Sequence, residues 1–234
     1  MDPLVAFLAP RAIPGLEEVA DGVYRRVVAG GRVIGLDDPA ARPIHGGDPA
    51  AAEAHLAGDP YLGPLVAARP GLRVPGTADG GELAIRAVLG QQVSLAAART
   101  LAARMLVAVG EPLPEPVGTL THAWPEPEAI VEYVPSLAMP RARQRAVAAM
   151  AGALADGLAL GPGVDARAEL LALPGIGPWT AEYIAMRALR DPDAWMPTDV
   201  GVRHGLARVG APVEAAEEWR PFRSHAVVHL WASG

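Results

Sequence analysis

The stretch "LPGIGPWTAEY", residues 173–183, places two glycines two residues apart in front of a segment that opens on a proline and a tryptophan. Glycine permits positive φ and leaves the backbone bare, so the N–H groups of Gly175, Ile176 and Gly177 can converge at the start of the following helix. Such a turn is suited to hold a phosphate, and it is equally suited to connect two helices tightly. Spacing alone leaves both interpretations open.

A single acid, Asp199, lies 20 residues beyond Trp179, within "AWMPTDVGVR" (194–203). The commonest role of an aspartate in front of a helix is to cap it. A carboxylate placed beneath a sugar can instead stabilise the positive charge that develops when a glycosidic bond breaks, and it can orient the attacking water. Taken alone, the position of Asp199 in front of a helix favours the capping role.

Helical segments of the second part of the chain must position these residues. Residues 79–110 predict two helices that meet at "GQQVS", where Gly90 interrupts the apolar pattern and Ser94 is a helix cap. Further helices are expected over 127–134, 140–157, 165–173, 178–190, 200–208 and 221–232. Beyond residue 79 we therefore expect the chain to be all-α.

The first part of the chain alternates short apolar pieces with turn signals. It predicts a hairpin turning at Gly30-Gly31 within residues 25–36, and a short helix over 48–58 capped by Asp48. We therefore expect a small α+β domain over 1–74 and a helical domain over 75–234, with a helix–hairpin–helix unit at about 165–190.

Composition excludes several kinds of chemistry. The 234 residues contain no cysteine, which excludes disulfides, thiolate metal sites and a catalytic thiol. All 20 basic residues are arginine, so no lysine Schiff base can form. The net charge of -6 argues against a broadly basic coat but allows a local arginine-lined site. His225 and His229 lack a third nearby ligand, so we expect no metal and no cofactor.

The sequence resembles the DNA-3-methyladenine glycosylase II family (AlkA type) of the helix–hairpin–helix DNA glycosylase superfamily. The resemblance covers almost the whole chain in the same order, including "FLAPRAIPGLEEVADGVYRR" (7–26), "IRAVLGQQVSLAAARTLAAR" (85–104), "LPGIGPWTAEYIAMRAL" (173–189) and "EEWRPFRSHAVVHLW" (217–231). It implies a mainly α fold of two helical lobes with a small N-terminal α+β appendage, which is abridged here.

The resemblance also implies roles for particular residues. Asp199 corresponds to the catalytic aspartate, and aromatic side chains of the base pocket are expected at Trp179, Tyr183 and Trp231. DNA contacts are expected at Gln91, Gln92, Gly175, Ile176, Gly177, Thr180 and Arg223, with Arg203 and Arg145 as further candidates. For each aromatic the ordinary alternative is core packing, for the glutamines it is capping, and for the arginines it is solvation.

The expected activity is removal of alkylated purines, of the 3-methyladenine and 7-methylguanine type, by base flipping in base-excision repair. Relatives that also cut the strand place a lysine where this chain has Trp179, so we expect a monofunctional enzyme. Two alternatives stay open: a module that binds damaged DNA without cutting it, and a glycosylase for deaminated bases such as hypoxanthine. Position 200 is valine where an aromatic is expected, which should widen the pocket.

The expected partner is double-stranded DNA that contains alkylated bases. No apolar run is long enough to span a membrane, and the first residues lack a basic signal region. We therefore expect a monomeric cytoplasmic protein associated with the nucleoid.

Overall fold

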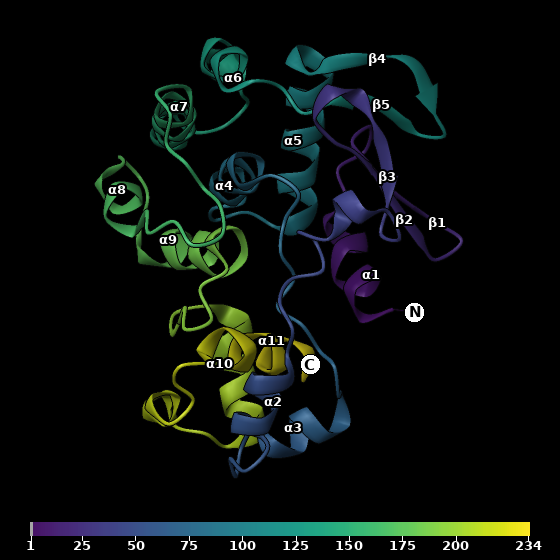
Figure 1. Cartoon of the computed structure of the whole chain (residues 1–234). Helices are drawn as coiled ribbons and strands as arrows, with labels where there is room; N and C mark the ends of the chain where they lie inside the picture. The colour runs from purple at the N-terminus through teal and green to yellow at the C-terminus, as the bar shows by residue number, and fades with distance from the viewer. Residues whose placement is uncertain (1) are drawn as a thin grey trace.

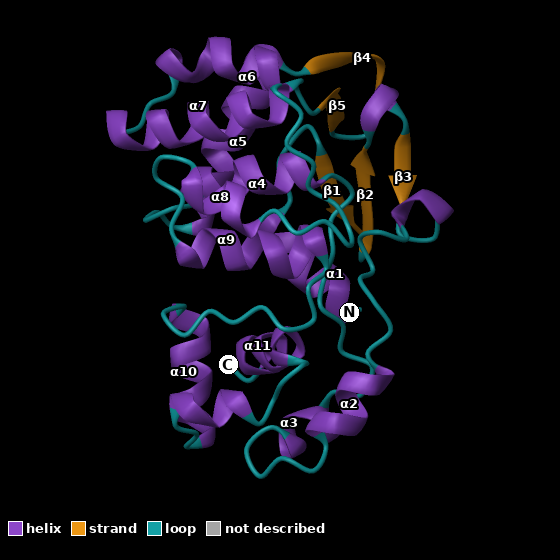
Figure 2. Cartoon of the chain, turned by 60° about the vertical axis from the view of Figure 1, so that its left-hand side comes forward, coloured by secondary structure: helices purple, strands orange, loops and turns teal. Residues whose placement is uncertain are grey.

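The computed structural model describes residues 2–234 and has two helical lobes, with small antiparallel sheets beside the larger one (Figures 1 and 2). This confirms the expected fold class. None of the helices in the described range has the length and apolarity that crossing a bilayer requires.

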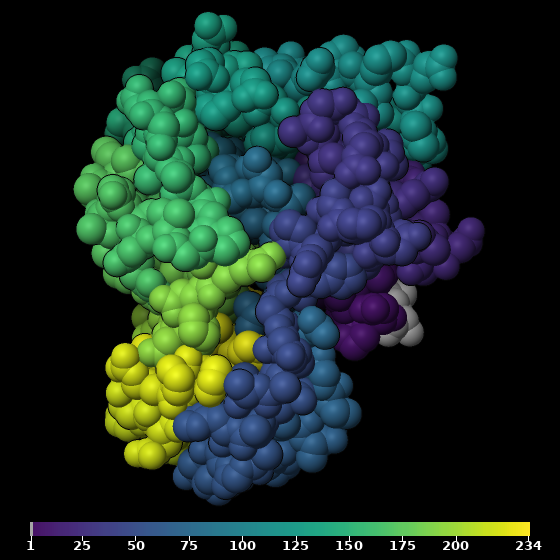
Figure 3. Space-filling view, viewed as in Figure 1, coloured from purple at the N-terminus to yellow at the C-terminus, as the bar shows by residue number. Residues whose placement is uncertain are grey.

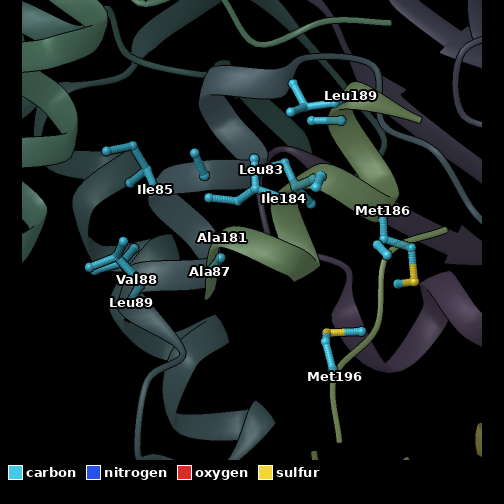
Figure 4. Packing of buried hydrophobic residues seen from close by; sticks show 14 of the residues in the cluster. Leu83, Ile85, Ala87, Val88, Leu89, Ala181, Ile184, Met186, Leu189 and Met196 are labelled. Carbon is cyan, nitrogen blue, oxygen red and sulfur yellow. The ribbon is translucent and has the colours of Figure 1, made fainter. Parts of the chain in front are cut away.

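The larger lobe is built around one almost fully buried helix, α4 (Gly80–Leu89). Figure 4 shows side chains of α4, among them Leu83, gathered against Ala181 and Ile184. Burial of these apolar groups stabilises the lobe, because a leucine or isoleucine side chain contributes about 1.5–3 kcal/mol when it leaves water. The other helices of the lobe are α5 (Leu95–Val109), α6 (Pro127–Tyr133), α7 (Arg141–Ala155), α8 (Arg167–Ala172) and α9 (Pro178–Ile184).

The predicted helix pair at "GQQVS" is present. The Asp79 carboxylate caps α4 by accepting from Glu82 N at 2.7 Å, and Ser94 Oγ caps α5 by accepting from Ala97 N at 3.2 Å. The helix expected over 178–190 is α9 followed by a π-helical turn over Ala185–Leu189. Extra turns of this kind are often found at functional sites, because they reorient the side chains that they carry.

The smaller lobe joins segments from the two ends of the chain. It contains α2 (Ala50–Leu56), α3 (Gly63–Ala68), α10 (Val200–Val209) and α11 (Arg223–Ala232), and Figure 3 shows the blue and yellow segments side by side. The fully buried Trp219 connects them, since its Nε1 donates to Asp59 Oδ2 at 2.9 Å. The expected helix over 48–58 is α2, and Asp48 accepts from Ala50 N at 3.0 Å. Residues 1–74 therefore contribute to both lobes, and a domain boundary at residue 74 stays a prediction.

The N-terminal sheet packs beside the larger lobe. It follows the short helix α1 (Pro3–Leu8) and has the order β1 (Glu17–Ala20), β2 (Val23–Val27) and β3 (Val33–Gly35), all antiparallel. Val27 pairs with Val33 around the turn that contains Gly30-Gly31, so the predicted hairpin is confirmed.

The expectation that the chain is all-α beyond residue 79 is wrong. Strands β4 (Glu111–Val117) and β5 (Leu120–Ala123) form a hairpin there. Pro112, Pro114 and Pro116 hold β4 extended and remove alternate backbone donors, which excludes a helix and suits an edge strand. The hairpin bonds to the N-terminal part of the chain, because Thr121 N donates to Gly15 O at 2.8 Å.

The two histidines of α11 are buried rather than available for metal binding. His229 is 1% exposed and His225 is 8% exposed, and no ring nitrogen of either has a hydrogen-bond partner in residues 2–234. Burial, followed by the proximity of His225, lowers the pKa of His229 to about 4. Burial also lowers the pKa of His225. These side chains are therefore expected to be neutral in the folded protein at pH 7.

Substituting His229 with leucine should make stability less dependent on pH. The unfolded chain binds the proton near pH 6.5, whereas folded His229 resists it to about pH 4, so stability decreases as the pH falls between these values. Between pH 7 and pH 5, this residue should lower the free energy of unfolding of wild type by on the order of 1–2 kcal/mol. The free energy of unfolding of His229→Leu should fall correspondingly less. Urea unfolding at the two pH values measures the difference. If the stability of the two proteins depended on pH identically, the lowered pKa of His229 would be contradicted.

Candidate active site

The glycine turn lies between α8 and α9, and its expected phosphate-binding role stays a prediction. Gly175 has a φ of +81°, and a Cβ at this position would lie 2.7 Å from the Ala146 Cβ of α7. Ile176 N donates to Leu173 O at 3.1 Å, and the Ile176 side chain is buried. Within residues 2–234 the N–H groups of Gly175 and Gly177 form no backbone hydrogen bond, so both are available to an external acceptor.

Asp199 is the point at which three N–H donors converge. Its Oδ1 accepts from the Trp231 indole Nε1 at 2.8 Å and from Val202 N at 2.9 Å. Its Oδ2 accepts from the Trp179 indole Nε1 at 2.9 Å. A carboxylate offers about four lone-pair sites, so three donors fix its orientation and leave one site open. Asp199 therefore both caps α10 and presents an oriented carboxylate.

Aromatic rings surround this carboxylate. Trp179 and Tyr183 stack with centroids 5.3 Å apart and planes 10° apart. Trp231 comes from the other lobe, with its centroid 6.5 Å from that of Tyr183. Phe7 of α1 lies nearly parallel to Trp231 at 6.3 Å. The three aromatics predicted from the sequence are thus brought together, and Phe7 joins them.

The site includes a cavity of about 520 Å³ that is lined from both lobes. The cavity is lined by Asp199, Trp179, Tyr183 and Trp231. The other charged groups of the lining are the guanidinium groups of Arg11, Arg86, Arg99 and Arg187. A cavity of this size accommodates a small organic group, and its walls are partly aromatic and partly cationic.

Tyr183 links the aromatic and cationic parts of the wall. Its hydroxyl accepts from Arg187 Nη1 at 2.8 Å. Burial raises the pKa of the Tyr183 phenol, but the charges of Arg187 and Arg11 outweigh burial and bring that pKa below its ordinary value. Arg187 is itself held by two carbonyls, since Nε donates to Pro75 O at 2.9 Å and Nη2 donates to Gly76 O at 2.7 Å.

A buried ionic cluster supports one side of the cavity. Glu17 and Glu82 face Arg26 and Arg86, and Arg86 Nη1 lies 3.0 Å from Glu17 Oε2 and 2.6 Å from Glu82 Oε1. Burial raises the pKa of Glu17, but Arg86 and Arg26 outweigh it and the pKa lies below its ordinary value. Burial, and then the charge of Glu17, raise the pKa of Tyr24, whose hydroxyl donates to Glu17 Oε1 at 2.6 Å. The cluster joins β1 and β2 to α4 and carries no net charge.

The two glutamines of the α4–α5 loop have different environments. Gln91 Nε2 donates to Gly175 O at 3.1 Å and to Thr180 Oγ1 at 3.0 Å, so this side chain braces the glycine turn. Gln92 is exposed and has a φ of +56°, which few residues other than glycine adopt. Strained backbone of this kind is often retained where a side chain must be presented to a ligand.

The side chains of two expected DNA contacts have partners within the chain, and their contacts with DNA stay predictions. The Thr180 side chain is 3% exposed and accepts from Gln91, so it faces the interior. Arg223 forms an ion pair with Asp193, with Nε to Oδ1 at 2.8 Å and Nη2 to Oδ2 at 2.9 Å, and this pair fixes the start of α11. In contrast, Arg203 and Arg145 are exposed.

The wider pocket expected from valine at position 200 stays a prediction. The Val200 side chain is 63% exposed and is not among the residues that line the cavity. Gly201 is the residue of that turn that borders the cavity. A Cβ on Gly201 would come within 2.6 Å of Trp231 Cδ1 and 3.1 Å of Asp199 Oδ1.

The sequence reasoning missed Phe7, Arg11, Arg187 and Gly201. Phe7 and Arg11 are four residues apart in "FLAPR", and the Arg11 Cζ lies 3.8 Å from the Phe7 ring centroid. Arg187 follows Tyr183 by four residues on the same helical face. These spacings were the available signal. The spacings indicate a shared site only when α1 is placed beside the segment that carries Tyr183 and Arg187.

The fold is that of the helix–hairpin–helix DNA glycosylases. A solved structure, a 3-methyladenine DNA-glycosylase from Archaeoglobus fulgidus, superposes with a TM-score of 0.74 at 21% identity and covers 98% of this chain and 92% of its own. The family model described as the AlkA N-terminal domain matches residues 46–79.

Two curated relatives extend the match through nearly the whole chain. Escherichia coli DNA-3-methyladenine glycosylase 2 is 35% identical over 97% of this chain and 92% of its own length. A Mycobacterium tuberculosis protein named as a probable bifunctional transcriptional activator/DNA repair enzyme AlkA is 41% identical over 97% of this chain. This chain spans 53% of that relative, about half its length. The chain belongs to the AlkA-type DNA-3-methyladenine glycosylase family.

Proposed function

We propose that this chain is a monofunctional DNA glycosylase that excises alkylated purines, of the 3-methyladenine and 7-methylguanine type, from double-stranded DNA. The observation that carries the proposal is the Asp199 carboxylate, held by the Nε1–H groups of Trp179 and Trp231 at an aromatic cavity. The names of the E. coli and A. fulgidus relatives support the substrate class.

The proposed reaction breaks the bond between C1′ of the sugar and a ring nitrogen of the base. The bond pair leaves with the base, and positive charge develops on the sugar. Asp199 stabilises that charge, and the open lone-pair site of its carboxylate accepts a hydrogen bond from the attacking water. The water oxygen bonds to C1′, and its proton passes to Asp199 and then to solvent. The product is an abasic site.

The cavity is expected to hold the base after it leaves the helical stack. The stacked rings of Trp179 and Tyr183 offer an electron-rich face, and such a face attracts a cationic alkylated base by about 0.5–2 kcal/mol. Trp231 is expected to close the other side of the pocket.

DNA binding is assigned to the surfaces around this cavity. The free N–H groups of Gly175 and Gly177 are suited to a backbone phosphate. Gln92 is positioned to enter the space that the flipped nucleotide vacates, while Gln91 holds the loop against the turn. The exposed Arg203 and Arg145 are further candidates for phosphate contacts.

The enzyme is expected to leave the strand uncut. Strand cleavage through a Schiff base needs an amine nucleophile, and Trp179 stands where strand-cutting members of the superfamily keep a lysine. The chain has no lysine at all. The indole of Trp179 instead donates to Asp199, so its contribution is to position the carboxylate.

A duplex with one 7-methylguanine tests the proposal, with the released base and the strand measured separately. Wild type is expected to release the base under single-turnover conditions and to leave a strand that breaks only after alkali treatment. Tight binding without base release would favour a module that only recognises damage. Strand breaks without alkali would contradict the monofunctional assignment.

Substituting Gly201 with alanine should lower base excision by about tenfold, equivalent to about 1.4 kcal/mol. The new methyl would overlap Trp231 Cδ1, so the indole must move and its hydrogen bond to Asp199 Oδ1 is lost or lengthened. Single-turnover rates and thermal midpoints of the two proteins are compared. Gly152→Ala is the matched control, because Gly152 lies in α7 and nothing is within 4 Å of its added Cβ. An unchanged rate for Gly201→Ala would contradict the positioning role of Trp231.

A further inference from the structure

A second, much smaller cavity lies next to the aromatic cavity that contains Asp199. Its volume is about 20 Å³, and we call it the small cavity. Four residues line both cavities, namely Arg11, Leu83, Arg86 and Arg187. A cavity holds one water once its volume reaches about 10–15 Å³. The small cavity therefore has room for a water or for one monatomic ion, and it is too small for a phosphate or sulfate group.

Positive charge exceeds negative charge around the small cavity. The guanidinium groups of its lining are those of Arg11, Arg26, Arg86 and Arg187. The carboxylate of its lining is that of Glu17, and the nearby Glu82 carboxylate pairs with two of the four arginines. Four guanidinium groups thus face two carboxylates, which leaves two positive charges uncompensated among the described residues.

The uncompensated charges belong to Arg11 and Arg187, which have no carboxylate partner within residues 2–234. The Arg187 guanidinium donates to three uncharged oxygens. Arg11 donates through Nη1 to Phe7 O at 2.8 Å, and its Nε and Nη2 have no hydrogen-bond acceptor in the same range. Arg11 therefore brings both charge and free donors to the small cavity.

The pKa of Arg11 reflects this crowding of like charges. Burial is the largest cause that lowers this pKa, and the charges of Arg187 and Arg86 lower it further. The group is nevertheless held in place, since its Cζ lies 3.8 Å from the centroid of the Phe7 ring. A partly desolvated cation gains more from a nearby anion than an exposed one does, because charges interact more strongly away from water.

The loop in front of α4 adds further donors. Thr77 and Ala78 line the small cavity and are partly buried, and their backbone N–H groups form no hydrogen bond in the described part of the chain. Arginine forks and backbone N–H groups are the donors with which proteins hold anions. The Glu17 carboxylate, in contrast, is already engaged, since Oε1 accepts from the Tyr24 hydroxyl at 2.6 Å and Oε2 accepts from Ile13 N at 2.9 Å.

We propose that the small cavity binds one monatomic anion of the size of chloride, held by the free donors of Arg11 together with Arg187. The bound ion connects the N-terminal segment that carries Arg11 to the π-helical turn that carries Arg187, so it stabilises the fold. It also removes one uncompensated positive charge beside the aromatic cavity. A cationic base in that cavity is then repelled less, and this last consequence alone rests on the proposed function.

Thermal unfolding of the DNA-free protein tests the proposal, with sodium chloride compared with sodium gluconate at equal concentration. Gluconate does not fit the small cavity, whereas an anion that binds only the folded state raises its stability by mass action. At about 0.2 M salt, the Tm of wild type should be about 2–4 °C higher in chloride than in gluconate. Equal Tm values in the two salts would overturn the proposal.

Arg11→Gln should lose this difference between the two salts, because it removes the charge and the fork. Arg99→Gln is the matched control, since Arg99 lines the aromatic cavity but not the small one, and it should keep the difference. A difference that disappears in both variants would assign the effect to the general field of the arginines and would overturn the assignment to the small cavity.

Crystals of wild type grown in sodium bromide provide a test that needs no variant. Bromide scatters anomalously, and we expect an anomalous peak within hydrogen-bond distance of Arg11 Nε or Nη2. Water alone in the small cavity would overturn the proposal and would leave the glycosylase activity in place. Failure to release 7-methylguanine in chloride and in gluconate alike would instead contradict the proposed function, whereas the bromide peak would still support the anion site.

Discussion

Asp199→Asn is expected to lower the rate of base excision by at least about a hundredfold, because the substitution removes the only carboxylate among the described residues that line the cavity. Asparagine retains one carbonyl oxygen, which can still accept from Val202 N and from the Trp231 indole, so α10 should keep its cap. The amide group that replaces Oδ2 is a donor and faces the Nε1–H donor of Trp179. The variant therefore loses the negative charge of Asp199 and its contact with the Trp179 indole.

The measurement is single-turnover release of 7-methylguanine, accompanied by binding of the same duplex. Binding should change much less than the rate, since the glycine turn and Gln92 remain intact. Thr198→Ala is the matched control, because Thr198 is an exposed neighbour of Asp199 that makes none of its contacts. Full activity of Asp199→Asn would contradict the proposed mechanism, whatever its effect on binding.

Glu82→Ala is expected to destabilise the fold by about 3–5 kcal/mol. Glu82 is 2% exposed and its carboxylate contacts both Arg26 and Arg86. Without it, the buried Arg26 and the half-buried Arg86 share Glu17 alone, which lies 3.7 Å from Arg26 Nη1 and 3.0 Å from Arg86 Nη1. An uncompensated buried charge is costly because it has lost its hydration.

Urea unfolding at pH 7 measures this loss. The control is Arg32→Ala, which removes the ion pair between Arg32 and Asp38 on the surface and should cost at most about 1 kcal/mol. Equal losses for the two variants would mean that the buried cluster does not hold β1 and β2 to α4. A loss confined to Glu82→Ala would locate a large part of the stability in this cluster.

The parts of the fold that local patterns determine were predictable from the sequence. Ser94 and Asp79 cap their helices because short polar side chains in front of apolar repeats accept from the first-turn N–H groups. The spacing of Trp179 and Tyr183 placed both rings on one helical face, opposite the buried Ala181 and Ile184. Asp199 was assigned through the family resemblance, because its position in front of a helix alone favours a cap.

The parts that depend on contacts between distant segments were not predictable. Phe7 and Arg11 join the site only because α1 lies beside the cavity, and no periodicity in a short N-terminal helix indicates that position. Phosphate contact and solvation were both left open for Arg223, because its partner, Asp193, lies 30 residues away in the sequence. The β4–β5 hairpin was missed because alternate prolines break the helical pattern but do not by themselves predict a strand.

Asp199 and the indoles of Trp179 and Trp231 are proposed to act as one unit. A double-mutant cycle tests this proposal most directly. Trp179→Phe keeps a stacking ring on Tyr183 and removes the Nε1–H donor to Asp199 Oδ2. We predict that it lowers single-turnover release of 7-methylguanine by about tenfold in the wild-type background and has no further effect in Asp199→Asn, since groups that act through one another are not additive. Equal losses in both backgrounds would contradict the claim, because they would show that Trp179 contributes independently of the carboxylate.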